Sequence, residues 1–189
     1  MESFKENTYM VRKYQLRTIL LCKINGKNLL GDCTCSRNIG EYSHKGLILL
    51  DILPQGQCIN AARYCSTLDR LKEAIRRKRP GLLRRGVVLQ HDNATPHSAN
   101  LTQQWLQRYG WEILPHPAHS PDLAPSDFHL FGPLKRHLGV MAFKTEDDLI
   151  SELRNWFDNL DVDFFRVGIN SLLSRWQKCI DLHGDYVEK

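Results

Sequence analysis

The fold is decided by the stretch Val87-Val88-Leu89-Gln90-His91-Asp92-Asn93. Its first four residues form a short run that is apolar enough for a central strand, and the run leads directly to Asp92. Ligand sites of open α/β sheets form at the carboxyl ends of strands, which is where this aspartate is expected. An acid there is costly to bury unless it is paired, hydrogen-bonded or bound to a metal ion. The stretch therefore predicts a buried strand that brings a carboxylate to the edge of a sheet.

Strands and helices alternate on both sides of this stretch. Upstream, residues 47–53 are an apolar run that predicts a buried strand. Asn60 then caps a predicted helix over residues 61–75, whose apolar residues share one face at spacings of three and four, and Pro80-Gly81 ends it. Downstream, residues 111–114 alternate in the manner of a further strand.

Caps and stop signals mark the remaining helices. Thr95-Pro96 has the form of an N-cap followed by a proline in the first turn, and Gly110 stops that helix. A proline-dense loop ends at Ser126-Asp127, where the next helix is predicted to begin. Thr145 and Asp148 form a capping box before an amphipathic helix, and a last amphipathic helix follows. This order of elements predicts an α/β layer architecture with right-handed crossovers.

The positive charge of the chain is concentrated in one segment. The formal net charge is +5, yet residues 70–85 contain eight basic residues and a single acid, Glu73. Such a block favours a polyanionic partner such as nucleic acid. The alternative is a solvated helix whose basic end suits the helix dipole. The basic residues of the block are Arg70, Lys72, Arg76, Arg77, Lys78, Arg79, Arg84 and Arg85.

Several functional classes find no support in the sequence. No apolar run approaches the roughly 20 residues of a membrane helix, and the N-terminus has no secretory signal, so no membrane partner is expected. Glycine-rich dinucleotide and phosphate loops are absent, which argues against a small-molecule cofactor. The histidines and cysteines fit no standard zinc spacing.

A second acid is a candidate partner for Asp92. Asp127 follows with 34 residues between the two, and the intervening strand could return the chain to the same edge of the sheet. Two carboxylates about 4 Å apart repel by roughly 4 kcal/mol at an effective dielectric constant near 20. Such a pair favours a shared proton or a hard cation, Mg²⁺ or Mn²⁺, which can activate water in phosphodiester chemistry. The alternative is that both acids are ordinary helix caps.

Several longer motifs carry a family resemblance. Their order along the chain matches the catalytic domain of mariner-family DNA transposases, which the sequence resembles from about Gly46 to Lys189. The motifs are His91-Asp92-Asn93-Ala94-Thr95-Pro96-His97, Leu114-Pro115-His116-Pro117, Ser120-Pro121-Asp122-Leu123-Ala124-Pro125-Ser126-Asp127-Phe128-His129-Leu130-Phe131, Ile59-Asn60-Ala61-Ala62-Arg63-Tyr64, Arg76-Arg77-Lys78-Arg79-Pro80 and Arg175-Trp176-Gln177-Lys178-Cys179.

The resemblance implies an RNase H-like fold, a mixed sheet flanked by helices in which three acids hold two divalent ions. It implies cut-and-paste DNA transposition, by hydrolysis at transposon ends and strand transfer to target DNA. Asp92 matches the second acid and Asp127 the third, with His91, Asn93 and Asp122 shaping the site. DNA as the partner, a homodimer and a nuclear location also follow from the resemblance.

The N-terminal part departs from the family pattern. Residues 1–45 form a divergent segment, with Asn25-Gly26 as the turn of a hairpin between residues 18–24 and Leu29-Leu30, before a partial catalytic domain at 46–189. The family's opening strand carries the first acid in a Gly-Asp-Glu context, so we expect that strand to be missing or replaced and the chain to be truncated, without the regions that recognise transposon ends. Gly31-Asp32 lies too close to the matched region to supply that acid.

Three hypotheses follow from this departure. In the first, Asp92 and Asp127 hold a single ion weakly and strand cleavage is impaired, because a two-metal clamp normally needs the bridging acid. In the second, the chain is a non-catalytic nucleic-acid-binding module that uses the basic residues 70–85. In the third, it is a decayed fragment without a selected function, in which residues 18–24 fill the gap in the sheet.

Overall fold

The computed structural model describes residues 18–24, 38–53 and 57–188 of the chain. At its centre lies a five-stranded sheet with the strand order β3-β2-β1-β4-β5. The strands are β1 (Thr18–Ile24), β2 (Asn38–Ser43), β3 (Gly46–Ile52), β4 (Val88–Gln90) and β5 (Glu112–Leu114). The three strands predicted from apolar runs are therefore confirmed as β3, β4 and β5, each shifted by one residue at most at either end.

The pairing of the strands makes the sheet mixed. β1, β4 and β5 are parallel neighbours, whereas β2 is antiparallel to both β1 and β3. Because β1 and β3 are both antiparallel to β2, β3 runs in the same direction as β1, β4 and β5. The carboxyl ends of these four strands consequently lie at one end of the sheet, and their amino ends lie at the other.

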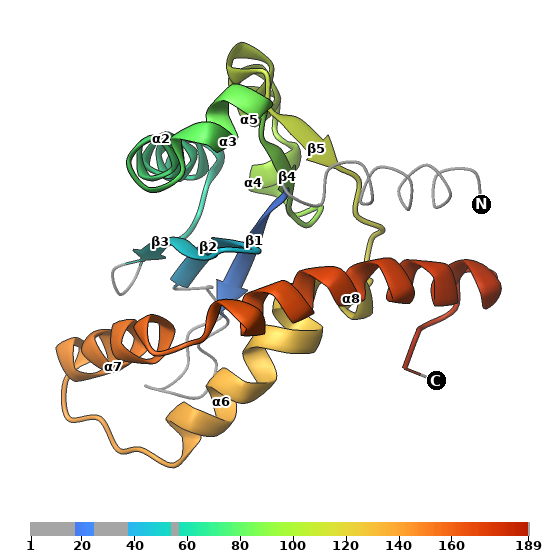
Figure 1. Ribbon diagram of the computed structural model, residues 1–189. Coiled ribbons are helices and arrows are strands. Elements are labelled where there is room, and N and C mark those ends of the chain that lie inside the picture. Colours follow the sequence, from blue (N-terminus) through green and yellow to red (C-terminus); the bar gives the residue numbers. More distant parts are fainter. Residues whose placement is uncertain (1–17, 25–37, 54–56, 189) are drawn as a thin grey trace.

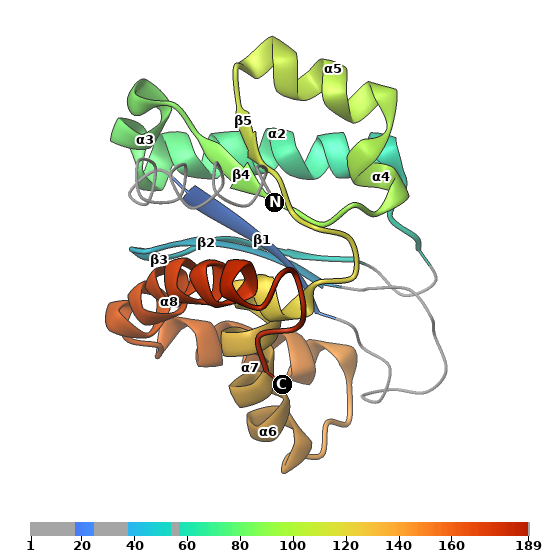
Figure 2. The same ribbon diagram turned by 90° about the vertical axis from the view of Figure 1, so that its right-hand side faces the viewer.

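Helices cover both faces of the sheet (Figures 1 and 2). One layer contains α2, α3, α4 and α5, and the other contains α6, α7 and α8. The α-helices are α2 (Ala61–Lys78), α3 (Pro80–Arg85), α4 (Thr95–Ser98), α5 (Asn100–Tyr109), α6 (Phe131–Gly139), α7 (Glu146–Asp158) and α8 (Val162–Asp181). Two shorter turns precede α6, the 3₁₀ turn η1 (Pro121–Leu123) and the π-helical turn η2 (Ser126–Leu130).

Apolar side chains fill the space between the sheet and each helical layer. On one side, the apolar face of α2 buries Leu68, Leu71 and Ile75 completely, in one cluster with Leu89 of the sheet. On the other side, α8 buries Trp176 completely. The spacing of three and four along α2 thus identified its buried face correctly. This two-sided packing fixes the positions of the strand ends, where the candidate site lies.

Local capping signals explain where most helices begin and end. The Asn60 side chain accepts a hydrogen bond from the Arg63 backbone, and Thr145 and Asp148 form the predicted capping box of α7. Gly110 ends α5 in the left-handed conformation, with φ of 62°. These predictions are confirmed.

The helix predicted from Thr95-Pro96 differs from the structure in two respects. Its N-cap is Ala94 rather than Thr95, and no side chain caps it. The helix is also broken at Ala99, whose extended backbone separates α4 from α5. The interruption turns the chain between the two short helices.

The sequence left open whether the opening strand of the sheet is missing or replaced, and the position of β1 distinguishes these alternatives. β1 lies next to β4 and pairs with it in parallel, with Leu20 opposite Gln90, so a strand occupies the opening position. This confirms that residues 18–24 fill the gap in the sheet. The hairpin partner predicted at Leu29-Leu30 lies outside the described residues, and the described strand that is antiparallel to β1 is β2. Asn25-Gly26 and Gly31-Asp32 lie outside the described residues.

Within the described part of the chain, the structure contains no helix with the length and apolar character needed to cross a membrane.

Candidate active site at the carboxyl end of the sheet

Asp92 lies two residues beyond the end of β4, where the sequence places it. Its side chain is 51% exposed, so it opens to solvent although the strand before it is buried. The Ala94 backbone N–H donates to Asp92 Oδ1 at 3.0 Å, and His97 Nδ1 lies 2.6 Å from the same oxygen. The local turn and the histidine together hold this carboxylate in one orientation.

His97 forms a buried support behind Asp92. Only 1% of its side chain is exposed, and its Nδ1 also lies 3.1 Å from the Asp92 backbone oxygen. Its ring stacks on His91, with centroids 4.9 Å apart, and lies 4.2 Å from the ring of Tyr64. The Tyr64 hydroxyl is 2.7 Å from His91 Nδ1, which ties the stack to α2. Groups of this kind, which fix the orientation of a ligating side chain, strengthen metal binding in proteins.

Asp127 reaches the same end of the sheet from the proline-dense loop. The loop closes with the 3₁₀ turn η1, and the Asp127 backbone N–H donates to the Ala124 carbonyl at 2.8 Å. The π-helical turn η2 follows, and Asp127 lies near its start, one turn before α6 begins. Desolvation by surrounding atoms raises the pKa of Asp127 to about 6, with Lys135 lowering it and the negative charge of Asp92 raising it further.

The two acids line one cavity of about 440 Å³. His116, His119 and Ser120 of the loop after β5 complete its wall. The sequence hypothesis required the two carboxylates to meet at one site, and the structure brings them to the same cavity. The effect of Asp92 on the pKa of Asp127 agrees with this placement, since a nearby negative charge disfavours ionisation.

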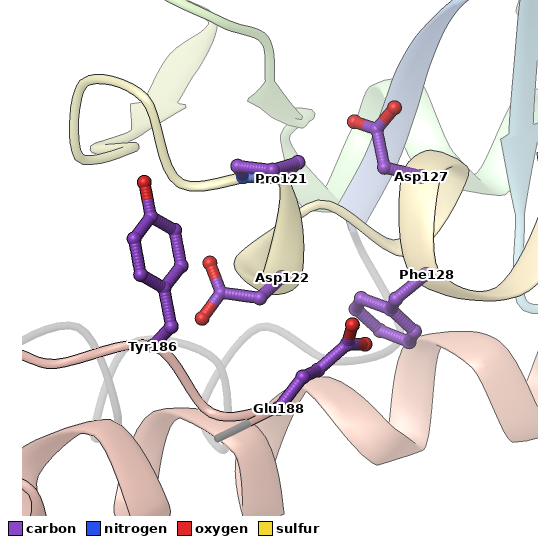
Figure 3. A pocket seen from close by; sticks show the side chains of 6 residues that line it. All are labelled: Pro121, Asp122, Asp127, Phe128, Tyr186 and Glu188. Atoms are coloured by element: carbon purple, nitrogen blue, oxygen red, sulfur yellow. The ribbon is translucent and has the colours of Figure 1, made fainter.

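Asn93 and Asp122 have separate structural tasks around this cavity. The Asn93 side chain donates to the His116 carbonyl at 2.8 Å and so links the ends of β4 and β5. Asp122 is buried and accepts a hydrogen bond from the Val187 backbone at 2.8 Å, which fastens the C-terminal segment to η1. Figure 3 shows Asp122 in a neighbouring pocket with Glu188, whereas the Asp127 carboxylate points away from Glu188.

The donor set suits a hard divalent cation. Two carboxylates face one cavity, and the electrostatic penalty between them would be relieved by Mg²⁺ or Mn²⁺, which prefer oxygen ligands. Among the residues that the structure describes, no group of three or more His, Cys, Asp and Glu side chains forms a metal-binding cluster. Residues 18–24 contain no acid, and continuing the β1–β4 register by two residues brings Cys22 level with Asp92.

The basic segment 70–85 lies elsewhere, and its members differ in their surroundings. Arg70 forms an ion pair with the buried Asp51 beneath α2. The Lys72 ammonium lies 3.3 Å from the centre of the Tyr109 ring. These two cations already have partners within the protein, which reduces what they can offer to a nucleic acid. Arg76 also has an acidic partner, Glu73. Lys78, Arg79 and Arg85 line a separate pocket near α3, described below.

Sequence reasoning missed the histidines at this site as functional residues. His97 and His116 were considered only as zinc ligands, for which their spacing is unsuitable. Burial lowers the pKa of His116, whereas Asp92 and Asp122 raise it, so its net shift favours a neutral ring. The signal that could have identified His97 is its position five residues after Asp92, on the short helix that follows the strand.

Fold and site together define an α/β domain of the RNase H-like class with paired acids at the carboxyl ends of its strands. A family model described as "Transposase (partial DDE domain)" matches residues 42–85. The crystal structure of the catalytic domain of the Mos1 mariner transposase is 32% identical and superimposes with a TM-score of 0.88, covering 98% of this chain and 92% of that one. The chain belongs to the mariner transposase family and corresponds to its catalytic domain.

Two curated relatives extend the comparison. The Mariner Mos1 transposase of Drosophila mauritiana is 39% identical over 149 residues, and the match covers 78% of this chain and 43% of the relative. The histone-lysine N-methyltransferase SETMAR of Homo sapiens is 38% identical over 148 residues, covering 78% of this chain and 22% of the relative. The chain therefore spans less than half the length of either relative.

Proposed function

We propose that this chain is a transposase-derived domain that uses a divalent metal ion at Asp92 and Asp127 for phosphodiester chemistry on DNA. The observation that carries the proposal is the placement of both carboxylates on one cavity at the carboxyl end of the sheet. Relatives support the same reading, since solved Mos1 structures include the catalytic domain with raltegravir and Mn or Mg and a pre-cleavage transpososome.

Each residue of the site has a defined task in this proposal. Asp92 and Asp127 would hold the ion, which when bound activates water and stabilises the leaving oxygen of a phosphodiester. His97 orients Asp92 from its buried side by its contact with Oδ1. Asn93 fixes the relative positions of the two strand ends through the His116 carbonyl. The geometry therefore supports a site in which the Asp92 carboxylate is oriented before the metal binds.

The same proposal includes impaired strand cleavage. In the family the opening strand supplies the first acid, and in this chain the position level with Asp92 on β1 is Cys22. Mg²⁺ is often held by one or two carboxylates together with water and substrate phosphate, so a single ion at this site is reasonable. Two ions about 3.5–4 Å apart need the bridging ligand that β1 does not provide. We expect weak binding of one ion and little cleavage.

A plasmid-nicking assay with Mg²⁺ or Mn²⁺ tests this proposal. The unmodified chain should produce nicked circles slowly, close to the rate of a metal-free control, and Asp127→Ala should abolish any metal-dependent part. If the unmodified chain nicks DNA robustly and Asp127→Ala abolishes this activity, the result would contradict impaired strand cleavage but support the metal site at Asp92 and Asp127. Robust nicking that persists in Asp127→Ala would contradict the site itself.

Nucleic-acid binding without cleavage is a second candidate function. Exposed cations at the end of α2 and on α3, including Lys78 and Arg85, favour it. Binding through such residues is governed by backbone phosphates and weakens by roughly 0.9 log units per contact for each log unit of salt. Fluorescence anisotropy with a random duplex at two salt concentrations measures this dependence. Absent or salt-insensitive binding would remove this candidate.

Assembly and location follow from the same relatives. Mos1 forms a paired-end complex, for which a solved structure with Mn is 30% identical to this chain with a TM-score of 0.83. We propose that this domain also pairs with a second copy when it is bound to DNA, and that it acts in the nucleus. Sedimentation of the chain with and without a DNA duplex would test the pairing. We expect a species that contains two copies of the chain only when the duplex is present.

A further inference from the structure

A second pocket lies at the amino end of the sheet, opposite the carboxylates. It has a volume of about 290 Å³ and is formed where the turn between β2 and β3 meets the end of α2 and the start of α3. Figure 2 shows α3 and α4 at opposite ends of the sheet, and Asp92 lies directly before α4. The separation is about the length of β3, a strand of seven residues at roughly 3.3 Å each, or about 20 Å.

The charged side chains that line this pocket are cationic. Lys45, Lys78, Arg79 and Arg85 contribute four positive side chains, and none of the described residues that line the pocket is acidic. We call these four residues the amino-end cations. Burial lowers the pKa of His44 in the same wall, and the nearby cations Lys45, Arg166, Arg85 and Arg79 lower it further, as expected next to concentrated positive charge.

Arg79 is held in place before any ligand binds. One nitrogen of its guanidinium donates to the Lys78 carbonyl at 3.0 Å, and another donates to the Lys45 carbonyl at 2.7 Å. Its Nε is buried and has no hydrogen-bond partner in the described part of the chain, and the same is true of His44 Nδ1. A pocket in which one arginine is held by hydrogen bonds among three further cations is suited to an anion with several acceptor oxygens.

We infer that the amino-end cations bind a backbone phosphate of DNA, at a position distinct from the phosphate that the carboxylates would act on. The inference rests on DNA as the partner under the proposed function, but it needs neither metal nor cleavage. Arginine and lysine that converge on one small pocket match the negative charge of a phosphodiester and donate hydrogen bonds to its acceptor oxygens. Because the pocket is about 20 Å from Asp92, a duplex held there is anchored away from the reacting bond.

Binding of a labelled random duplex in EDTA tests the inference, by anisotropy over a range of salt concentrations. The test variant is the triple substitution Lys45→Gln, Lys78→Gln, Arg85→Gln. The matched control is Arg76→Gln, Arg77→Gln, Arg84→Gln, which removes the same number of positive charges, from residues of α2 and α3 that do not line the pocket. The test variant should bind about tenfold more weakly and with a salt slope smaller by about 0.9, whereas the control should change less than about threefold.

Three outcomes would overturn the inference. Equal losses in both triple variants would mean that affinity comes from diffuse charge. An unchanged duplex affinity in the test variant would exclude the pocket directly. A thermal shift by inorganic phosphate that the test variant loses, without any loss of duplex affinity, would make a free anion the ligand. If the triple variant fails to fold, Lys78→Glu alone, at an exposed helix position, carries the same expectation. Absence of any duplex binding by the unmodified chain would instead refute DNA as the partner.

Discussion

The two ends of one sheet carry opposite charges in this domain. At the carboxyl end, Asp92 and Asp127 line a cavity that is supported from behind by buried histidine and tyrosine rings. At the amino end, the amino-end cations line a pocket in which no described lining residue is acidic. Each end follows from its local elements. Loops after strands deliver the acids, whereas the cations come from the turn between β2 and β3 and from the ends of α2 and α3, where the helix dipole favours positive charge.

The two ends also differ in what the proposed functions ask of them. Four cations of the described residues line the pocket at the amino end, whereas two carboxylates of the described residues line the cavity at the carboxyl end. Under the proposed function, DNA binding and DNA cleavage therefore depend on separate sites and should respond to separate substitutions.

Restoring an acid on β1 should have the largest effect. Cys22→Asp places a carboxylate level with Asp92, and we expect metal-dependent nicking to rise by about 100-fold, since a ligand contributing about 3 kcal/mol corresponds to two orders of magnitude in rate. Plasmid nicking with Mn²⁺ measures the gain. Lys23→Asp, one register position away, is the control and should give no gain. Equal rates for the two variants would contradict the assignment of position 22.

Removing the support behind Asp92 should have the next largest effect. His97→Leu should weaken Mn²⁺ binding by about 10–100-fold, because partners that orient a ligand typically contribute that much. His97→Asn is the matched variant, since its amide nitrogen can replace Nδ1 as a donor to Asp92, and it should recover most of the affinity. Calorimetry measures the binding, and thermal unfolding verifies the fold. Equal losses of Mn²⁺ affinity in both variants would mean that His97 only packs in the core and does not orient Asp92.

Metal affinity should also depend on pH through Asp127. Its pKa of about 6 means that protons compete with the ion below that pH, so affinity should fall roughly fivefold from about pH 6 to about pH 5 and level off above about pH 7. Lys135 lowers this pKa, so Lys135→Gln should move the inflection to higher pH. Calorimetry across this range measures the inflection. An inflection that stays in place in Lys135→Gln would contradict the account.

The smallest effect concerns a buried acid between the two ends. Glu41 on β2 is completely buried, and neither of its carboxylate oxygens has a hydrogen-bond partner among the described residues. Burial and then Asp51 raise its pKa well above the usual value, with Arg70 lowering it. Folding therefore favours its protonated form, and the free energy of unfolding should decrease as pH rises above the pKa of the unfolded chain.

Glu41→Met should accordingly stabilise the protein by about 1–3 kcal/mol near pH 7, which for a domain of this size is about 2–4 °C in Tm per kcal/mol. The gain should shrink toward pH 4, where the carboxyl is protonated in both states. Differential scanning calorimetry at two pH values measures it. Glu73→Met, at an exposed position on α2, is the control and should change Tm little. A loss of stability in Glu41→Met would show that the carboxyl has a partner after all.

Much of the fold from residue 46 onward could be predicted because its signals are local. Runs of apolar residues identified β3, β4 and β5, and capping residues such as Asn60 and Thr145 fixed helix starts. The pairing of β1 with β2 could not be predicted, since it joins segments separated in the sequence and depends on tertiary contacts rather than on a turn signal. The sequence alone also gave no reason to expect a parallel pairing between β1 and β4.

The residues of the candidate site also divide into those that local sequence signals identify and those that depend on tertiary contacts. Asp92 and Asp127 were predictable from strand ends, spacing and motifs. The contact of His97 with Asp92 was not, because it depends on the helix break at Ala99 and on the rings of the buried stack. Arg70 was assigned to nucleic acid from charge alone, and its pairing with the buried Asp51 became visible only in three dimensions.

The most direct test of the central claim is a calorimetric titration of the unmodified chain with Mn²⁺ at neutral pH, repeated on Asp92→Asn and Asp127→Asn. The account predicts one weakly bound ion per chain, with binding lost in each variant. Binding that survives in both variants, or no binding to the unmodified chain at all, would contradict the claim that these two carboxylates together hold a cation.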